Sequence, residues 1–228
     1  MSDLQIIYMK TIPGLPNLSI GSVFCIGRNY QKHAAELGNT VPDQPMVFLK
    51  PAGSVIGDGD TILLPSQSTD VQHEVELVIA IGREGKNISP KNALGFIAGY
   101  AVGIDVTARD LQQQAKNRSH PWSVAKGFDT FAPVSKFIPA ENAAKLNAMD
   151  ISLQVNGQQR QHGNTAHMIF SIEQLITHLS TIFTLRPGDL IFTGTPEGVS
   201  PINHGDTVVA SLNDDEVTLN LSVRNDGQ

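Results

Sequence analysis

The sequence predicts a β-rich α+β fold, and three observations support this prediction. The 20 glycines and 13 prolines are spread along the chain and separate short apolar runs, a rhythm typical of strands joined by turns. Apolar residues make up 40% of the 228 residues, which is enough for a sizeable core. Helical patterns are few and short. We see no repeat, low-complexity tract or linker, and therefore expect one domain over residues 1–228, with residues 1–22 as a lead-in.

Eight segments are predicted to be strands, because each is a short run of apolar and β-branched residues bounded by turn residues. They are residues 23–26, 46–49, 75–81, 97–104, 151–155, 190–193, 208–212 and 217–223. Asn156-Gly157 follows one of these strands and supplies a hairpin turn, and Pro187-Gly188-Asp189 precedes another.

Four short helices are predicted from their capping residues. They cover residues 30–37 and 107–116, a segment that Ser171 opens and Ile182 ends, and a short piece that starts at Ser89-Pro90. Asn29 is expected to cap the first helix and Gly38 to close it. Ser171 with Gln174 three residues later has the pattern of a capping box.

Charge and composition exclude several classes of function. With 16 Lys+Arg and 22 Asp+Glu the net charge is −6, so no global basic field favours nucleic acid or an anionic membrane as partner. The N-terminus lacks the pattern of a secretory signal, and no stretch approaches the ~20 apolar residues of a membrane span. We therefore expect a soluble, cytoplasmic protein. Cys25 is the only cysteine, which excludes an internal disulfide, and we expect it to be a small core residue.

The segment with the strongest chemical pattern is residues 73–81. Its period-2 alternation sends the apolar side chains to one face and Glu74 and Glu76 to the other. Asp105, at the end of the next apolar run, is the best third carboxylate. Three such oxygen ligands suit Mg²⁺ or Mn²⁺, with positions left for water and substrate. The alternative is that Glu74 and Glu76 form the wet face of an edge strand.

Further candidate residues lie around this segment. His33 and Glu36 share one helical face, an arrangement in which a carboxylate orients a histidine that takes a proton from water; a surface His–Glu pair is the alternative. Lys126 lies among small and apolar residues and can stabilise an enolate or a carboxylate, or it is a solvated loop lysine. Arg28, Lys50 and the loop over residues 194–198 are further candidate anion contacts.

Common nucleotide and hydrolase motifs do not occur in the sequence. We find no GxGxxG, GxSxG or Walker loop, so nucleotide binding and serine hydrolase chemistry have no support. The remaining histidines, at positions 120, 162, 167, 178 and 204, have no ligand spacing.

Taken together, these segments resemble the fumarylacetoacetate hydrolase family, in particular its short single-domain acylpyruvase/oxaloacetate decarboxylase branch. The matching pieces run in order from about residue 23 to the C-terminus. They are Gly27-Arg28-Asn29-Tyr30 with His33 and Glu36, Phe48-Leu49-Lys50-Pro51, residues 73–77 (HEVEL), residues 103–110 (GIDVTARD), Pro121-Trp122 with Lys126, residues 168–172 (MIFSI), and Gly194-Thr195-Pro196.

The resemblance implies a fold, a cofactor and roles for individual residues. It implies a mixed β-sandwich roll whose open end holds Mg²⁺ or Mn²⁺ on the three carboxylates, with the His33–Glu36 pair as catalytic dyad and Lys126 as active-site lysine. Gln112 matches a glutamine that helps hold a lid helix, and Thr195 a threonine near the substrate carboxylate. Arg28 and Asn29 lie where contacts with the ligand are usual. A homodimer is also implied.

The implied reaction is cleavage of a C–C bond in a 2,4-dioxo acid. His33 deprotonates a water that attacks the distal carbonyl, and a pyruvate enolate leaves, stabilised by the cation and Lys126; oxaloacetate gives the same enolate by loss of CO₂. The N-terminal extension of fumarylacetoacetate hydrolase itself does not precede the first motif, so we expect acylpyruvates, oxaloacetate or 2-hydroxymuconates as substrates. A lid that carries His33 is expected to exclude water.

Two alternatives to this reaction stay open. An isomerase or tautomerase of the same family uses the same metal and enolate but does not need the His33–Glu36 pair. A non-catalytic metal-binding domain uses the carboxylates only to stabilise the fold.

Overall fold

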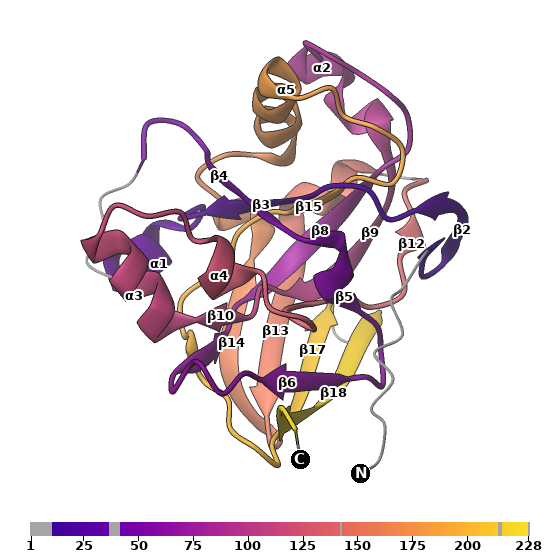
Figure 1. The fold of residues 1–228 in the computed structure, drawn as a ribbon. Helices are drawn as coiled ribbons and strands as arrows, with labels where there is room; N and C mark the ends of the chain where they lie inside the picture. Colours follow the sequence, from indigo (N-terminus) through magenta and orange to yellow (C-terminus); the bar gives the residue numbers. More distant parts are fainter. Residues whose placement is uncertain (1–10, 37–41, 142, 214–215, 228) are drawn as a thin grey trace.

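The computed structural model of the protein describes residues 11–36, 42–141, 143–213 and 216–227. Its centre is a six-stranded mixed sheet in the order β12-β9-β8-β15-β3-β4 (Figure 1). These strands are β3 (Val23–Gly27), β4 (Met46–Lys50), β8 (Val75–Ile81), β9 (Ile97–Ile104), β12 (Ile138–Pro139) and β15 (Leu190–Phe192). β15 runs parallel to β3, and the other neighbouring pairs are antiparallel.

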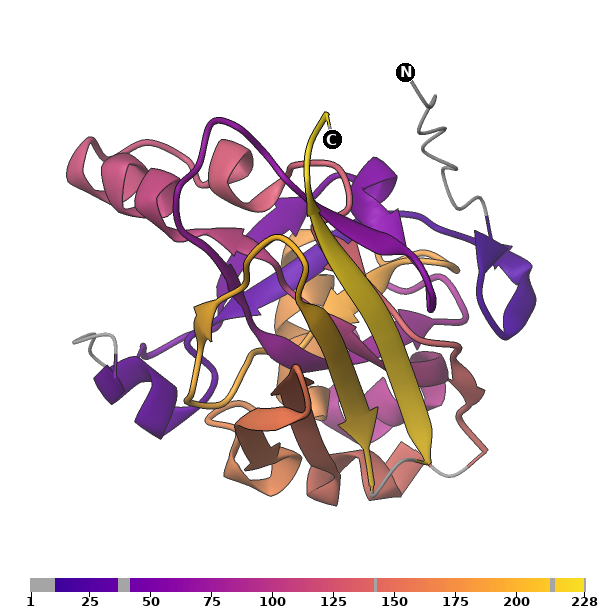
Figure 2. The ribbon, with the colours of Figure 1, turned by 90° about the horizontal axis from the view of Figure 1, so that it is seen from below.

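A five-stranded sheet packs against the central one and has the order β14-β13-β17-β18-β6. Its strands are β6 (Thr61–Leu64), β13 (Asp150–Val155), β14 (Gln158–Asn164), β17 (Thr207–Leu212) and β18 (Val217–Asn225). The view from below shows β17 and β18, in yellow, in front of the rest of the molecule (Figure 2). There are also three small sheets in the described chain. One has the order β10 (Thr107–Ala108), β7 (Val71–His73) and β16 (Ser200–Pro201). The second pairs β11 (Ala132–Pro133) with β5 (Val55–Ile56), and the third pairs β1 (Thr11–Ile12) with β2 (Leu15–Ser19).

The core fills both faces of the central strand β8. Its alternate residues Val75, Leu77, Ile79 and Ile81 belong to a cluster that includes side chains of β13, β17 and β18, so this cluster lies between the two sheets. Val78 and Ala80 point the other way, into a second cluster. The predicted β-rich α+β sandwich is therefore confirmed. The prediction of a core position for Cys25 is also confirmed, because it is buried in the second cluster.

The helices lie at the edges of this sandwich. They are α1 (Gln31–Glu36), α2 (Pro90–Ala93), α3 (Arg109–Asn117), α4 (Ser123–Lys126) and α5 (Ile172–Ile182), with 3₁₀ turns at Ala52–Ser54, Leu94–Phe96, Ala143–Ala148 and Thr165–His167. Figure 1 shows α2 and α5 together above the central sheet, and α1, α3 and α4 at one side of it. Within the described ranges, none of these helices has the length and apolar character needed to cross a lipid bilayer.

All eight predicted strands are present, with ends that differ by at most two residues. The hairpin turn is confirmed as well, since Asn156 and Gly157 both have positive φ, 52° and 74°. The capping box of α5 is confirmed in both directions between Ser171 and Gln174. The helix expected from residue 107 begins at Arg109, because Thr107–Ala108 pairs with β7 as a short strand.

The prediction that Asn29 caps α1 is wrong. Its side-chain amide donates to the carbonyls of Phe170 and Thr193, at 3.1 and 2.8 Å, and its Oδ1 accepts from the Phe170 N–H at 2.8 Å. Asn29 therefore holds three segments together at the end of β3. The expected end of this helix, Leu37 with Gly38, lies outside the described residues.

Candidate active site

Three buried carboxylates meet where β8 begins and β9 ends. Glu74 directly precedes β8, Glu76 is its second residue, and Asp105 directly follows β9. The Asp105 N–H donates to the Glu74 carbonyl at 2.8 Å, which continues the antiparallel pairing of the two strands. One oxygen from each carboxylate lies within 4.8 Å of the others, and the residues are 5%, 1% and 1% exposed. The wet face of an edge strand is therefore the wrong interpretation of Glu74 and Glu76.

The Lys126 ammonium lies against this triad. It is 2.9 Å from Glu74 Oε2 and 2.6 Å from Asp105 Oδ2, and it donates to Thr107 Oγ1 at 2.6 Å. Lys126 is buried, so it is not a solvated loop lysine. Arg109 pairs with the other oxygen of Glu74. Burial by itself would raise the pKa of Glu74, but Lys126 and Arg109 outweigh burial and hold this pKa well below its usual range.

Lys50 supports the triad from behind. Its ammonium lies 2.8 Å from Asp105 Oδ1 and donates to the carbonyls of Val106 and Lys126, at 2.9 and 2.6 Å. Lys50 is buried and, like Asn29, does not line the pocket. Contact of the Lys50 and Asn29 side chains with a ligand stays a prediction. In the structure, Lys50 positions Asp105 and the end of α4.

The Glu76 carboxyl group has no ion-pair partner among the described residues. Its Oε2 accepts a hydrogen bond from the Gly194 N–H at 2.7 Å. Burial, followed by the charges of Asp105 and Glu74, raises the pKa of Glu76 well above its usual range. Such a carboxylate needs either a proton or a cation.

A hard divalent cation fits this donor set. Besides the uncompensated Glu76, the buried Asp105 Oδ1 receives no hydrogen bond from any described group, although the Lys50 ammonium is close to it. Three carboxylates with oxygen lone pairs to spare are typical ligands of Mg²⁺ or Mn²⁺, and sites of this kind keep positions for other oxygen ligands. The triad therefore fits the ion that the resemblance implies.

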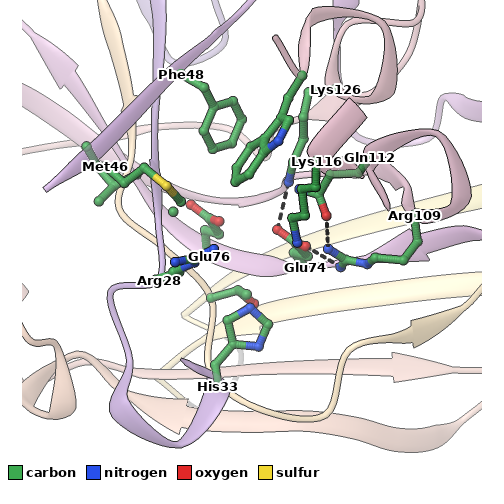
Figure 3. A pocket seen from close by; sticks show the side chains of 14 residues that line it. Arg28, His33, Met46, Phe48, Glu74, Glu76, Arg109, Gln112, Lys116 and Lys126 are labelled. Atoms are coloured by element: carbon green, nitrogen blue, oxygen red, sulfur yellow. Dashed lines mark hydrogen bonds and ion pairs between the residues drawn. The ribbon is translucent and has the colours of Figure 1, made fainter. Parts of the chain in front are cut away.

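Helix α1 carries a histidine that is oriented by a carboxylate. His33 Nδ1 lies 3.2 Å from Glu36 Oε2, and because an ionised carboxylate can only accept, Nδ1 carries the hydrogen and Nε2 is the free acceptor. The Gly198 N–H donates to Glu36 Oε1 at 3.1 Å and holds this carboxylate in place. His33 is 4% exposed and lines the same pocket as Glu74 and Glu76 (Figure 3). It is therefore not a surface histidine.

A buried chain of hydrogen bonds fixes Thr195. The Val75 N–H donates to Gln161 Oε1 at 3.0 Å, so the amide nitrogen of Gln161 faces the other way. This nitrogen donates to Thr195 Oγ1 and to the Pro196 carbonyl, both at 2.9 Å. His73 Nδ1, 2.8 Å from Gln161 Oε1, must donate to it as well. Because Thr195 Oγ1 accepts from Gln161, its own hydrogen can be donated into the pocket that it lines.

The pocket joins these groups and is narrow. Gln112 lines it, and its Oε1 accepts from Arg109 at 2.8 Å; Arg28 also lines it. Met46 and Phe48 supply apolar wall (Figure 3). Its open volume is about 30 Å³, room for two or three water molecules at about 10–15 Å³ each by the same measure. A keto acid therefore enters only if side chains or α1 move.

Several residues of this site were not found by the sequence reasoning. Arg109 had a signal, because it follows Asp105 by four positions at the start of a predicted helix. Lys116, about two turns further along that helix, also lines the pocket. Gln161 had no local signal, since it lies in the polar strand β14 and reaches the site only through the pairing of the sheets.

Comparison with known protein families identifies one match over most of the chain. The family model described as "Fumarylacetoacetate (FAA) hydrolase C-terminal" matches residues 22–223. All the site residues described above lie within this range.

Comparison with individual proteins gives similar results. The mitochondrial oxaloacetate decarboxylase of Dictyostelium discoideum is 46% identical over 191 residues, which cover 83% of this chain and 88% of that protein. The mitochondrial oxaloacetate tautomerase FAHD1 of Arabidopsis thaliana is 45% identical over 190 residues, which cover 83% of this chain and 85% of that protein. The crystal structure of fumarylpyruvate hydrolase from Pseudomonas aeruginosa, in complex with Mn²⁺ and pyruvate, superimposes with a TM-score of 0.87 at 38% identity, and 95% of each chain is covered.

Proposed function

This chain belongs to the fumarylacetoacetate hydrolase family, and we propose that it cleaves a C–C bond in a 2,4-dioxo acid in a metal-dependent reaction. The activity is that of an acylpyruvate hydrolase, with fumarylpyruvate as one of the acylpyruvates, or that of an oxaloacetate decarboxylase. Both reactions pass through the enolate of pyruvate. The similarity to an oxaloacetate decarboxylase and to a fumarylpyruvate hydrolase supports this substrate class.

One observation carries the proposal: a carboxylate-oriented histidine lines the same pocket as Glu74 and Glu76, two of the three carboxylates of the triad. The triad suits a metal ion, which is common to hydrolases, decarboxylases and isomerases of keto acids. The His33–Glu36 pair adds a base for water, which hydrolysis of a C–C bond requires. The Gly198 N–H donates to Glu36 and holds this carboxylate in place.

We propose Glu74, Glu76 and Asp105 as the ligands of Mg²⁺ or Mn²⁺. When bound, the cation supplies positive charge beside the 2-oxo group, where negative charge develops during cleavage. Around it, Lys126 offers an ammonium to the same developing charge. Thr195 donates its hydroxyl hydrogen to the substrate carboxylate, and Gln112 and Arg28 hold the substrate in the pocket.

In the hydrolytic step, His33 Nε2 takes a proton from water and Glu36 stabilises the imidazolium that results. The oxygen of this water bonds to the distal carbonyl carbon. The bond between that carbon and C3 of the pyruvate unit then breaks, and its electron pair remains on the pyruvate unit as an enolate. A proton returned to C3 completes the reaction and releases pyruvate and the acid.

A panel of four substrates tests this proposal. Acetylpyruvate, fumarylpyruvate, oxaloacetate and a 2-hydroxymuconate are each followed by NMR, with Mg²⁺ and with a chelator. We expect at least one of the first three to yield pyruvate with Mg²⁺ and none with the chelator. Conversion of the 2-hydroxymuconate, or keto–enol conversion of oxaloacetate, with no pyruvate from any of the first three substrates would overturn the proposal in favour of an isomerase.

The His33→Ala variant tests the role of the dyad. Loss of the base should lower kcat for acylpyruvate cleavage by roughly 10²–10⁴-fold, with a smaller change in KM, measured by pyruvate release. His178→Ala, on α5 and outside the pocket, is the matched control. Undiminished cleavage by the His33 variant would exclude this histidine as the base.

The second candidate is a tautomerase, and the similarity to the Arabidopsis oxaloacetate tautomerase favours it. A proton shift between keto and enol forms uses the triad and Lys126 but breaks no C–C bond. It does not require His33 to activate water, so its rate should be less affected by His33→Ala than cleavage is. NMR of oxaloacetate distinguishes the two, because only decarboxylation produces pyruvate.

A third possibility is a metal ion that only stabilises the fold. Chelation of a catalytic ion removes activity reversibly, with a modest loss of melting temperature. Chelation of a structural ion mainly lowers the melting temperature. Among the described residues, three carboxylates meet at this site and leave coordination positions for substrate, which supports a catalytic ion.

We further propose a homodimer and a cytoplasmic location, as the family resemblance and the sequence suggest. Analytical ultracentrifugation measures the first and fractionation of the source cells the second. The choice between Mg²⁺ and Mn²⁺ follows from activity titrations with each ion. Because the fumarylpyruvate hydrolase structure is a complex with Mn²⁺, the activity titration has to include Mn²⁺.

A further inference from the structure

The pocket contains two cationic side chains that form no ion pair with any acidic group the structure describes. Of its basic side chains, Lys126 and Arg109 pair with Glu74. Lys116 and Arg28 also line the pocket, but no described acidic group lies within ion-pair distance of either. A pocket that holds positive charge beyond what its own carboxylates balance is suited to an anion.

Lys116 is held beside other positive charges. It lies on α3, is half-buried, and its ammonium is 5.4 Å from the centre of the Trp122 ring. Burial, followed by the nearby charges of Arg109 and Arg28, lowers the pKa of Lys116. The charges of Arg109 and Arg28 oppose that of this ammonium, and an anion placed there would lower the cost of keeping these side chains together.

Arg28 is held in an unusual backbone conformation. Its φ is 60°, in the left-handed region, which a side chain of this size rarely adopts. The next residue fixes this conformation, because the Asn29 carbonyl accepts from the Ile169 N–H at 2.8 Å and the Asn29 side chain is tied to Phe170 and Thr193. Strain held in this way is typical of functional sites.

The two side chains enter the pocket from different walls. Arg28 follows β3, whereas Lys116 reaches in from α3, on the side of Arg109 and Gln112 (Figure 3). We infer that Lys116 and Arg28 form an anion subsite for the second carboxylate of a dicarboxylic substrate. This inference rests on the proposed function, which assigns the 2-oxo acid end of the substrate to the carboxylate triad and Thr195.

The subsite determines which substrates are preferred. A 2-oxo or 2,4-dioxo dicarboxylic acid can bind at both ends, with charge-assisted hydrogen bonds at its far carboxylate. A monocarboxylic analogue of the same length leaves Lys116 and Arg28 without a partner. The protein should therefore prefer the dicarboxylic member of each matched pair.

Binding of two uncleavable analogues tests this without turnover. 2-Oxoglutarate and 2-oxopentanoate share the 2-oxo acid end and the five-carbon length, and differ in the second carboxylate. With the Mg²⁺-loaded protein, calorimetry should give a Kd for 2-oxoglutarate that is lower by about tenfold or more. In Lys116→Met, which keeps a long apolar side chain for the Trp122 contact, this preference should fall to within about threefold.

Two further variants complete the binding experiment. Lys116→Arg retains the charge and should restore most of the preference, and Arg28→Gln should reduce it. Lys91→Met, an exposed lysine on α2, is the matched control and should leave it unchanged. Circular dichroism and melting curves establish that each variant is folded. An unchanged preference in folded Lys116→Met and Arg28→Gln would overturn the subsite.

Turnover gives an independent readout. The ratio of kcat/KM for fumarylpyruvate over acetylpyruvate should fall in Lys116→Met by about tenfold or more. Equal falls for both substrates would contradict a role in selecting the second carboxylate. A wild-type protein that prefers 2-oxoglutarate but cleaves none of the substrates would disprove the proposed function and leave the subsite standing, so the two failures can be told apart.

Discussion

The hydroxyl hydrogen of Thr195 illustrates how a single side chain is given one role by its neighbours. The backbone N–H of Val75 forces the amide of Gln161 into one orientation, and this amide then donates to Thr195 Oγ1. A threonine that accepts on the protein side can donate on the other. Gln161 never touches the pocket, so it acts as a positioning residue for Thr195.

A double-mutant cycle measures this positioning. Thr195→Val should raise KM for a 2,4-dioxo acid by roughly tenfold, since one hydrogen bond to a charged carboxylate is lost. Gln161→Met should have an effect of similar size in the wild type but little further effect in Thr195→Val, because the two residues act as a unit. The kinetic constants come from pyruvate release. Additive effects would mean that Gln161 only stabilises the fold.

Local spacing made part of this site predictable. Glu74 and Glu76 are two positions apart on a strand, His33 and Glu36 are three apart on a helix, and the structure brings each pair together as expected. Gln161 and Lys116 were not predictable in this way. The role of Gln161 depends on how the strands pair in the sheets. The role of Lys116 depends on which cationic side chains of the pocket have no described acidic partner. Both are properties of the folded chain.

At the scale of elements, helix α1 combines burial of its histidine with few attachments. His33 is buried, while the neighbours Gln31 and Lys32 are exposed. The Glu36 carboxylate bonds to the Gly198 N–H, at 3.1 Å, Lys32 pairs with Glu197 at 3.3 Å, and Tyr30, just before the helix, bridges to Met168. Among the described residues, these polar contacts attach α1 to neighbouring loops. A short helix attached in this way can move away from a pocket that is too narrow to admit a substrate.

Hydrogen exchange tests whether α1 acts as a lid. With Mg²⁺ and oxalate, a mimic of the 2-oxo acid end, we expect the amides of Gln31–Glu36 to exchange about tenfold more slowly, since closing lowers the open population. The amides of α5, which lies away from the pocket, serve as the reference and should not change. Equal exchange of α1 with and without oxalate would show that the lid prediction is wrong.

Strand β14 is an element that the sequence analysis did not predict. Its residues Gln158–Asn164 are mostly polar, and Gln161 is its one fully buried member. The search for short apolar and β-branched runs, which located the eight predicted strands, cannot detect such a polar edge strand. The Asn156-Gly157 turn was the available signal, since a hairpin turn after β13 requires a returning strand.

At the scale of the whole molecule, Glu76 links stability to pH. In the metal-free protein its pKa is raised above the unfolded value of about 4.3, so the native state keeps a proton that the unfolded chain releases. This contribution to stability is present below the unfolded pKa and is lost as the pH rises through the folded pKa. Glu74, whose pKa is lowered, contributes stability that is lost only as the pH falls below about 4.

Calorimetry with a chelator present tests this dependence. Between about pH 5 and 8 the melting temperature of the metal-free wild type should fall, and in Glu76→Gln, which cannot ionise, the fall should be smaller. Glu84→Gln, an exposed glutamate outside the pocket, is the control and should behave as the wild type does. The same slope in all three proteins would mean that Glu76 does not hold a proton in the metal-free state.

The loop over residues 194–198 bonds at one end to a proposed metal ligand and at the other to the dyad. The Gly194 N–H donates to Glu76, and the Gly198 N–H donates to Glu36 of α1. Metal binding and closure of α1 both act on this loop, which can therefore couple them. If metal binding favours closure of α1 by some factor, closure must raise metal affinity by the same factor. A substrate that draws α1 closed would thus also tighten the hold on its own cation, and release of product would loosen both together.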